Sequence, residues 1–267
     1  METLHSVEVA KGNRFEFGAN WALLLGLMND ERIEQAVESL KTMLGVRDLH
    51  GKRFLDAGSG SGLFSLAARK LGATVHSFDF DPASVACTRE LKRRYFPEDE
   101  TWTIEEGSVL DREYLLNLGQ FDVVYSWGVL HHTGAMWQAL QNLMGLVTDK
   151  LFIAIYNDQG WVSKYWTKVK QLYNGSAPGR LLMIGFHVPY LYAFRFLIRK
   201  VSNRPLERGM NLWRDMIDWL GGLPFEVARP EEVLLFSLER GLSCTNLKTC
   251  GGRMGCNEYV FARTERV

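Results

Sequence analysis

The sequence predicts an α/β protein with a Rossmann-like, doubly wound and mostly parallel sheet of about seven strands. Runs typical of buried strands alternate with runs of helical spacing between residues 53 and 156, as in a parallel sheet with helices on both faces. A glycine-rich turn follows the first strand, and polar residues follow the next ones. Because ligands of such sheets bind beyond the carboxyl ends of the strands, these residues indicate a nucleotide site there.

The first predicted strand, residues 53–57, runs into a turn that contains Gly58, Gly60 and Gly62. A helix is expected after the turn, because apolar residues recur with helical spacing over residues 63–71. Glycines between a strand and a helix let the backbone approach a ligand closely and direct free helix N–H groups at it. The turn is therefore the first candidate for the nucleotide site.

The second predicted strand covers residues 73–81 and ends in acidic residues. Asp79 follows Gly62 by 17 residues, a spacing that suits a carboxylate accepting both hydroxyl protons of a ribose. Phe80 beside it is placed to stack on a purine. Residues 82–94 form the next predicted helix, which opens with proline.

The elements after this helix continue the alternation of strands and helices. Strands are predicted within 102–111 and at 121–127, 150–156, 243–249 and 258–263, and helices at 135–146, 161–173, 181–198, 212–220 and 230–240. In the exit of the third strand, Ser108 and the backbone of Val109 are candidate contacts to the edge of a base. His131 and His132 lie in the exit of the fourth strand, so all these residues fall at one edge of the sheet.

Two cofactors fit a glycine turn followed by an acid: a dinucleotide and S-adenosylmethionine. A dinucleotide site usually reads G-x-G-x-x-G, whereas Gly62 comes one place earlier. Asp56, just before the turn, is unfavourable beside a pyrophosphate and favourable beside the ammonium group of a methionine moiety. Both features favour S-adenosylmethionine.

The motif Asp56-x-Gly-x-Gly-x-Gly, the acid Asp79 and the exit Ser126-Trp-Gly-Val-Leu-His-His resemble class I S-adenosylmethionine-dependent methyltransferases of the ubiquinone-methylase-like kind. The resemblance covers about residues 15–157 and the last strands, and it implies an antiparallel last strand. It also implies that the glycines line the methionine and ribose, and that Asp56 helps to hold the amino-acid end. The expected cofactor-binding residues are Asp56, Gly58, Ser59, Gly60, Gly62, Asp79, Phe80, Ser108, Val109, Ser126 and Trp127. Ser108 departs from the family pattern, in which aspartate is common.

The candidate catalytic residues are His131, His132 and Tyr156. A sulfonium methyl group is already activated, so its transfer needs in-line placement and a nucleophile with a lone pair. Imidazole titrates near neutral pH and suits a general base. The alternative is that at least one histidine is a structural turn residue and that Tyr156 is a core aromatic.

A long insertion separates the fifth strand from the next sheet element. The predicted organisation is an S-adenosylmethionine-binding domain of residues 1–157 plus 222–267, with an N-terminal helical lid, and a helical cap of residues 158–221. Residues 181–198 are nearly all apolar; a buried cap helix is expected there, with contact to a membrane or to an apolar substrate as the alternative. Expected substrate-binding residues are Trp21, Asn157, Asp158, Trp161, Asn257 and Glu258.

Composition limits the class of protein. The 267 residues include 46% apolar residues, enough for one large α/β domain with an insertion, and 31 basic residues match 31 acidic ones. This balance argues against a general nucleic-acid binder. Four cysteines suit a reducing cytosol, their spacing predicts no metal site, and no signal-peptide pattern opens the chain. A cytoplasmic location is therefore expected.

The predicted function is methyl transfer from S-adenosylmethionine to a small-molecule acceptor with an apolar or aromatic character, at a hydroxyl oxygen. Three alternatives remain open: an N-methyltransferase, a methyltransferase that acts on RNA or protein, and a nucleotide-binding partner protein without catalysis. No nucleic-acid partner is expected from the neutral charge.

Overall fold

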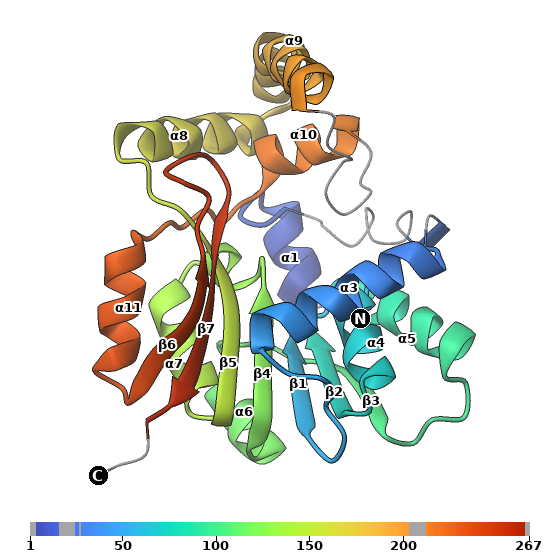
Figure 1. The fold of residues 1–267 in the computed structure, drawn as a ribbon. Helices are drawn as coiled ribbons and strands as arrows, with labels where there is room; N and C mark the ends of the chain where they lie inside the picture. Colours follow the sequence, from blue (N-terminus) through green and yellow to red (C-terminus); the bar gives the residue numbers. More distant parts are fainter. Residues whose placement is uncertain (1–3, 16–24, 27, 203–211, 265–267) are drawn as a thin grey trace.

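The structure is a computed structural model that describes residues 4–15, 25–26, 28–202 and 212–264. Its centre is one sheet of seven strands in the order β3-β2-β1-β4-β5-β7-β6 (Figure 1). The strands are β1 (Arg53–Ala57), β2 (Thr74–Asp79), β3 (Trp102–Glu106), β4 (Phe121–Trp127), β5 (Val147–Tyr156), β6 (Leu242–Lys248) and β7 (Cys256–Arg263). β7 runs antiparallel to both β5 and β6, and the pairings among β1 to β5 are parallel. The predicted fold class, including the antiparallel last strand, is confirmed.

Helices cover both faces of the sheet, because alternate residues of each buried strand point to opposite faces. One face packs on α3 (Asp30–Leu44), α4 (Leu63–Lys70) and α5 (Pro82–Tyr95). The other face packs on α6 (Arg112–Leu118), α7 (Met136–Met144) and α11 (Pro230–Leu238). Neighbouring residues of β1 divide between the two cores: Phe54 belongs to the first and Leu55 to the second.

Helix ends follow local side-chain chemistry. The Asn29 side chain accepts a hydrogen bond from the Arg32 N–H and begins α3. Asp81 caps α5 in the same way, with Pro82 at the first helical position. Two short helices, α1 (Leu4–Ala10) and α6, were not predicted, because seven residues give too few turns for a clear periodic pattern.

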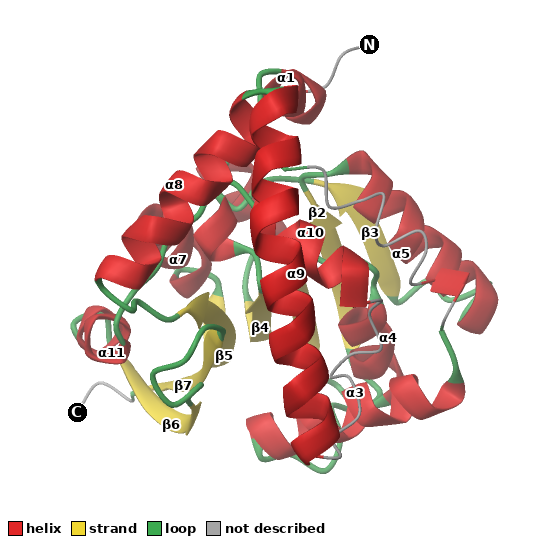
Figure 2. Ribbon diagram, turned by 90° about the horizontal axis from the view of Figure 1, so that it is seen from above, coloured by secondary structure: helices red, strands yellow, loops and turns green. Residues whose placement is uncertain are grey.

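A layer of helices lies over the carboxyl ends of the central strands (Figures 1 and 2). It consists of α8 (Trp161–Gly175), α9 (Ala177–Ser202) and α10 (Leu212–Gly221). These helices share an apolar cluster of their own, which includes Trp166, Tyr173 and Met216. No helix in the described part of the chain has both the length and the apolar character needed to cross a bilayer.

A strap of residues 222–228 leads from α10 back to the sheet. The Glu226 N–H donates to the His131 carbonyl, and the Ala228 N–H donates to the Tyr156 carbonyl. The Phe15 N–H donates to the Leu223 carbonyl, so the N-terminal segment is tied to the same strap. The exits of β4 and β5, the strap and the N-terminal segment therefore meet at one place.

Candidate active site

The three glycines of the turn have backbone conformations that other residues adopt only with strain. Gly58, Gly60 and Gly62 have φ of 88°, 54° and 78°, which is the left-handed region that glycine enters freely. The N–H groups of Gly58 and Ser59 donate to the Phe78 carbonyl, which fixes the turn to the end of β2. A Cβ on Gly58 would lie 2.3 Å from a methyl carbon of Val129, in the exit of β4.

Asp79 closes the turn from the neighbouring strand. Its two carboxylate oxygens accept from the N–H groups of Gly60 and Asp81, each at 2.9 Å. A carboxylate has about four lone-pair sites, so two remain for hydroxyl donors. Burial raises the pKa of Asp79 to about 6, with the nearby Asp81 adding to the effect of desolvation. A further hydrogen-bond donor would stabilise its ionised form.

The N-terminal segment covers this edge. The Arg14 guanidinium lies over the Phe80 ring at 4.8 Å, and Arg14 Nη1 donates to the His132 carbonyl at 3.1 Å. His5 of α1 packs edge-on against Phe80, 5.8 Å between ring centroids. Arg14 therefore bridges the exits of β2 and β4. The Phe80 face that was expected to stack on adenine is in contact with Arg14 in this arrangement.

Asp56 is held by internal hydrogen bonds. It is 1% exposed, and Ser65 Oγ donates to its carboxylate at 2.5 Å. Ser77 donates to Ser65, and Trp102 Nε1 donates to Ser77, which gives a buried chain of hydrogen bonds beneath the glycine turn. Burial raises the pKa of Asp56 to about 7. In the structure this carboxylate thus contacts α4 through Ser65, and its contact with the amino-acid end of a cofactor stays a prediction.

Several other predicted cofactor residues have internal partners. Ser126 is fully buried and donates to the Ala57 carbonyl, and Ser59 pairs with the Thr88 hydroxyl. Trp127 Nε1 donates to Glu258 at 3.2 Å, so a predicted cofactor residue and a predicted substrate residue bind each other. Their side chains join strands and helices, which accounts for them without a ligand.

Ser108 and Val109 lie next to Asp79, because the loop after β3 and the end of β2 meet at the same edge of the sheet. The Gly107 N–H donates to the Asp79 carbonyl, and Ser108 Oγ accepts from the Leu110 N–H at 3.2 Å. Val109 is 6% exposed. The side chain of Ser108 thus shapes the loop that follows β3.

His132 has a fixed tautomer. Its Nδ1 lies 2.6 Å from the Pro224 carbonyl oxygen. Because a carbonyl only accepts, Nδ1 carries the proton and Nε2 holds the lone pair. Burial lowers the pKa of His132 to about 3, helped by the positive charges of Lys170 and Arg14. The ring is therefore neutral at physiological pH.

His131 is fully buried one position earlier, in the 3₁₀ turn η1 (Leu130–His132). Its Nδ1 lies 3.3 Å from the Tyr156 N–H, and its Nε2 has no hydrogen-bond partner among the described residues. Burial keeps the pKa of His131 well below its usual range, with His132 and Lys170 contributing. A buried polar atom without a partner is uncommon and often marks a functional position.

Tyr156 stands between the histidines and the helical layer. Its ring centroid is 3.8 Å from that of His131 and 5.5 Å from that of His132. Lys170 of α8 is fully buried above it; the ammonium donates to the Trp219 carbonyl and lies 4.6 Å from the Phe225 ring. The neutral imidazoles of His131 and His132, the phenol of Tyr156 and the ammonium of Lys170 thus lie close together.

The predicted substrate residues lie mainly outside this cluster. Asn257 Nδ2 donates to Asn157 Oδ1, which ties the exit of β5 to β7. Asp158 accepts from the Gly160 N–H in the turn before α8, and Trp161 is 78% exposed at the start of that helix. Trp21 lies outside the described residues. Unlike Tyr156, these side chains are used in turns and strand contacts or face solvent.

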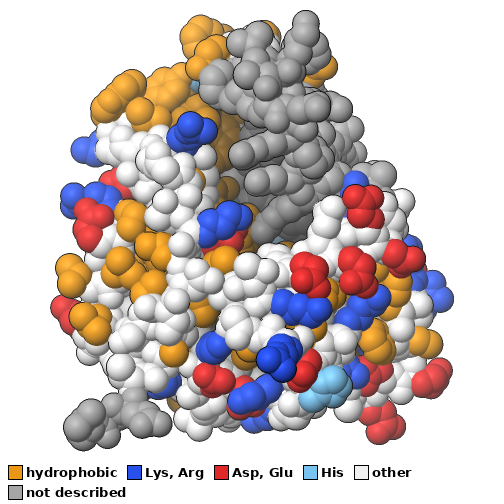
Figure 3. Space-filling view, in the orientation of Figure 1, with side chains coloured by type: hydrophobic (Ala, Val, Ile, Leu, Met, Phe, Trp, Pro, Cys, Tyr) orange, Lys and Arg blue, Asp and Glu red, His pale blue; other side chains and the backbone are white. Residues whose placement is uncertain are grey.

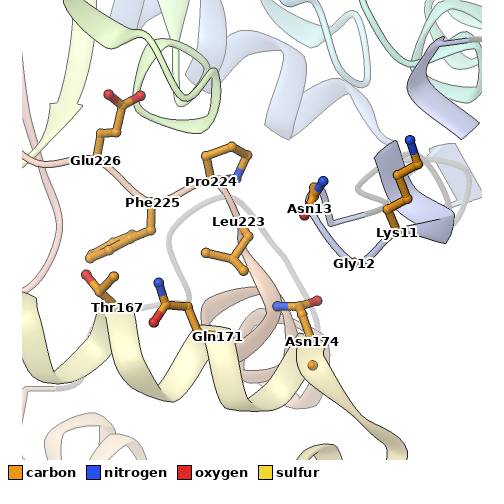
Figure 4. Close-up of a pocket in the computed structure, with 11 residues that line it drawn as sticks. Lys11, Gly12, Asn13, Thr167, Gln171, Asn174, Leu223, Pro224, Phe225 and Glu226 are labelled. Carbon is orange, nitrogen blue, oxygen red and sulfur yellow. The ribbon is translucent and has the colours of Figure 1, made fainter. Parts of the chain in front are cut away.

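A cavity of about 510 Å³ lies beside the strap, between α8 and the N-terminal segment (Figure 4). Thr167, Gln171 and Asn174 of α8 line one side of it. Pro224 and Phe225 line the other side. These two residues also contact His132 and Tyr156, so the strap separates the cavity from the histidine cluster.

Three residues of the cluster were missed from the sequence: Arg14, Lys170 and Pro224. Lys170 carries a usable signal, because it occupies a position on the apolar stripe of α8 together with Trp166 and Tyr173. Arg14 and Pro224 carry none, since their roles depend on contacts with residues more than 90 positions away in sequence.

The sheet order, the glycine turn and the acid that ends β2 define a class I S-adenosylmethionine-dependent methyltransferase fold. The solved structure of magnesium protoporphyrin IX methyltransferase from Synechocystis PCC 6803 with bound SAH has this fold. It superposes with a TM-score of 0.52 at 15% identity, over 88% of this chain and 83% of that one.

The family model described as a methyltransferase domain matches residues 55–150. The ribosomal protein L11 methyltransferase of Deinococcus radiodurans is 47% identical over 51 residues, 19% of this chain and 19% of that protein. The tRNA U34 carboxymethyltransferase of Pseudomonas savastanoi pv. phaseolicola is 37% identical over 87 residues, 32% of this chain and 26% of that protein. The chain thus spans about a fifth to a quarter of the length of the curated relatives that it matches.

Structures of the same fold hold SAM or SAH. In this chain a Cβ on Gly58 would collide with Val129 and a Cβ on Gly62 with Thr88, and Asp79 keeps lone-pair sites at the strand end. We propose that the turn and Asp79 hold the ribose and the adjoining methionine of S-adenosylmethionine.

Proposed function

We propose that the protein transfers a methyl group from S-adenosylmethionine to a hydroxyl oxygen of a small-molecule acceptor. The observation that carries this proposal is the contact between the two halves of the site. Val129 packs on Gly58 of the cofactor turn, and the His132 N–H donates to the Val129 carbonyl. A general base therefore follows directly on the loop that borders the cofactor turn.

The cofactor supplies a methyl group on a positively charged sulfur, so the chain's task is placement and management of the acceptor proton. His132 is the proposed base, because the Pro224 carbonyl holds its proton on Nδ1 and the basic lone pair is therefore on Nε2. Tyr156 and the unpartnered Nε2 of His131 are proposed to orient the acceptor oxygen.

Lys170 narrows the class of acceptor. Its buried positive charge disfavours an imidazolium and favours an oxyanion at the same place. A weakly basic His132 is best matched by an acidic hydroxyl, such as a phenol. The aromatic surroundings, Trp219 and Phe225, also suit an aromatic ring. We further propose that residues 158–221 are the cap that selects this acceptor.

The test is release of S-adenosylhomocysteine with panels of phenols, aliphatic alcohols and amines. His132→Gln is expected to lower turnover about a hundredfold or more, while the affinity for S-adenosylmethionine stays within about twofold. His50→Gln is the matched control, because His50 is exposed beside Asp48, on the loop before β1. Unchanged turnover in His132→Gln would remove this residue from the mechanism. Release with amines but not with phenols would establish the N-methyltransferase alternative.

A further inference from the structure

Charge is distributed unevenly along this neutral chain. Residues 159–206 contain eight lysines and arginines and no aspartate or glutamate. Because the whole chain has 31 residues of each sign, the rest carries a net charge of −8. Lys164, Lys168 and Arg180 of this segment are exposed, whereas Lys170 is buried in the site described above. Helices α8 and α9, which lie in this segment, are therefore a strongly basic part of the protein.

The outer side of α9 is apolar where it meets solvent. Between residues 181 and 193 the inward side consists of Met183, His187, Val188 and Leu191, with Ile184 half-buried. The outward side contains Leu181, Leu182, Gly185, Phe186, Pro189, Tyr190, Tyr192 and Ala193. Leu182 is 65% exposed and Phe186 is 71% exposed. A helix that is apolar on all sides is normally buried. The outward side of α9 is therefore suited to bind a partner that shields these apolar side chains from water.

The exposed side of α8 adds aromatic and basic residues. Trp161 is 78% exposed, Leu172 57% and Tyr165 41%. Lys164 and Lys168 lie on the same side of the helix, within one turn of Tyr165. Figure 3 shows apolar side chains, with lysine or arginine beside them, over the end of the molecule where α8 and α9 lie. We call these exposed residues of α8 and α9 the outer cap surface.

We propose that the outer cap surface binds an anionic lipid bilayer, with α9 lying in the interface. Exposed leucine, phenylalanine and tryptophan beside lysine and arginine are typical of helices that insert one side among lipid headgroups. The proposal is independent of the identity of the acceptor.

Two other occupants fit the surface less well. A second copy paired about a two-fold axis would bring Lys164, Lys168 and Arg180 of both chains together, and like charges repel. A nucleic acid would satisfy the charges but leave Leu182 and Phe186 in water. An anionic bilayer matches both the charge and the apolar side chains.

The test is co-sedimentation of the full chain with vesicles of phosphatidylcholine, with and without about 30% phosphatidylglycerol. Binding is expected only with the anionic lipid, and about 0.5 M NaCl should weaken it. Leu182→Ser with Phe186→Ser should lower the partition coefficient about tenfold or more. Lys164→Glu with Lys168→Glu should lower it to a similar extent.

Matched controls change equally exposed residues elsewhere. Leu116→Ser with Leu235→Ser alters apolar residues that are 64% and 59% exposed on α6 and α11, and it should leave binding unchanged. Equal sedimentation of the Leu182 and Phe186 variant and the unaltered chain would overturn the proposal. It would also be overturned if the chain failed to bind vesicles and instead formed a dimer or bound tRNA through this surface. Circular dichroism and S-adenosylmethionine binding verify that each variant is folded.

Discussion

The cofactor edge and the histidine cluster are adjacent, yet they are built in different ways. The cofactor edge comes from one stretch of chain, in which Gly60 and Asp79 are 19 residues apart. The histidine cluster joins Arg14, His132, Lys170 and Pro224, with 92 residues between His132 and Pro224. A local motif therefore sets the cofactor edge, whereas long-range packing sets the histidine cluster, the half proposed to handle the acceptor.

The two halves meet closely where Val129 packs on Gly58, and Gly58→Ala tests this contact. The new Cβ would lie 2.3 Å from a Val129 methyl carbon, so the turn or the loop before the histidines must shift. Overpacking of this kind costs about 1–3 kcal/mol, so we expect cofactor affinity to fall up to about a hundredfold. Turnover at saturating cofactor should fall as well, because the histidine loop moves.

Gly251→Ala is the control for Gly58→Ala in calorimetry and turnover assays. Gly251 also has positive φ, at 65°, but has open space around its Cβ position. Gly251→Ala therefore introduces backbone strain like that of Gly58→Ala, but its new Cβ collides with no neighbouring atom. Equal effects of the two substitutions would mean that backbone strain, and not the contact with Val129, is responsible.

Asp79→Asn should affect the cofactor half alone. Loss of the charged acceptor is expected to weaken S-adenosylmethionine binding by about tenfold or more. In the unaltered chain the affinity should also fall as pH drops below about 6, because the buried carboxylate then takes up a proton. Isothermal titration at several pH values measures both effects. A pH-dependent affinity that persists in Asp79→Asn would assign the titration to another group.

Lys170→Met should affect the acceptor half alone. The buried positive charge of Lys170 lowers the pKa of both histidines and is proposed to stabilise an oxyanion. The substitution removes both effects. We expect turnover of phenolic acceptors to fall several-fold to about tenfold with unchanged cofactor affinity. The control is Lys168→Met on the exposed side of α8. A loss of cofactor affinity in Lys170→Met would show that the two halves are not separable.

The smallest effect on cofactor affinity and turnover is expected for Asp56→Asn, which tests the stability of the buried chain of hydrogen bonds beneath the turn. A carboxyl with its pKa raised to about 7 stabilises the folded state below pH 4, and this contribution is lost as pH rises through 7. Asparagine keeps the acceptor for Ser65 and does not titrate. The free energy of unfolding of the variant, relative to the unaltered chain, should therefore rise between pH 4 and 8 by up to about 4 kcal/mol. Urea unfolding at the two pH values measures it, and a constant difference would contradict the buried-carboxyl assignment.

Prediction from the sequence succeeded where the signal is local. The alternation of strands and helices predicted the doubly wound, mostly parallel sheet that the structure contains. It failed for α1 and α6, which have seven residues each. It also could not separate a half-buried carboxylate at the end of β2, as Asp79 is, from one buried beneath the turn, as Asp56 is.

The sequence alone determined the fold class, the glycine turn and the acid that ends β2, because periodicity, turn chemistry and spacing act over short stretches of chain. Only the tertiary structure decided the tautomer of His132, the position of Arg14 across the edge and the burial of Lys170. Those features depend on which distant segments pack together. A hydrogen bond between residues 92 positions apart leaves no pattern in either neighbourhood of the sequence.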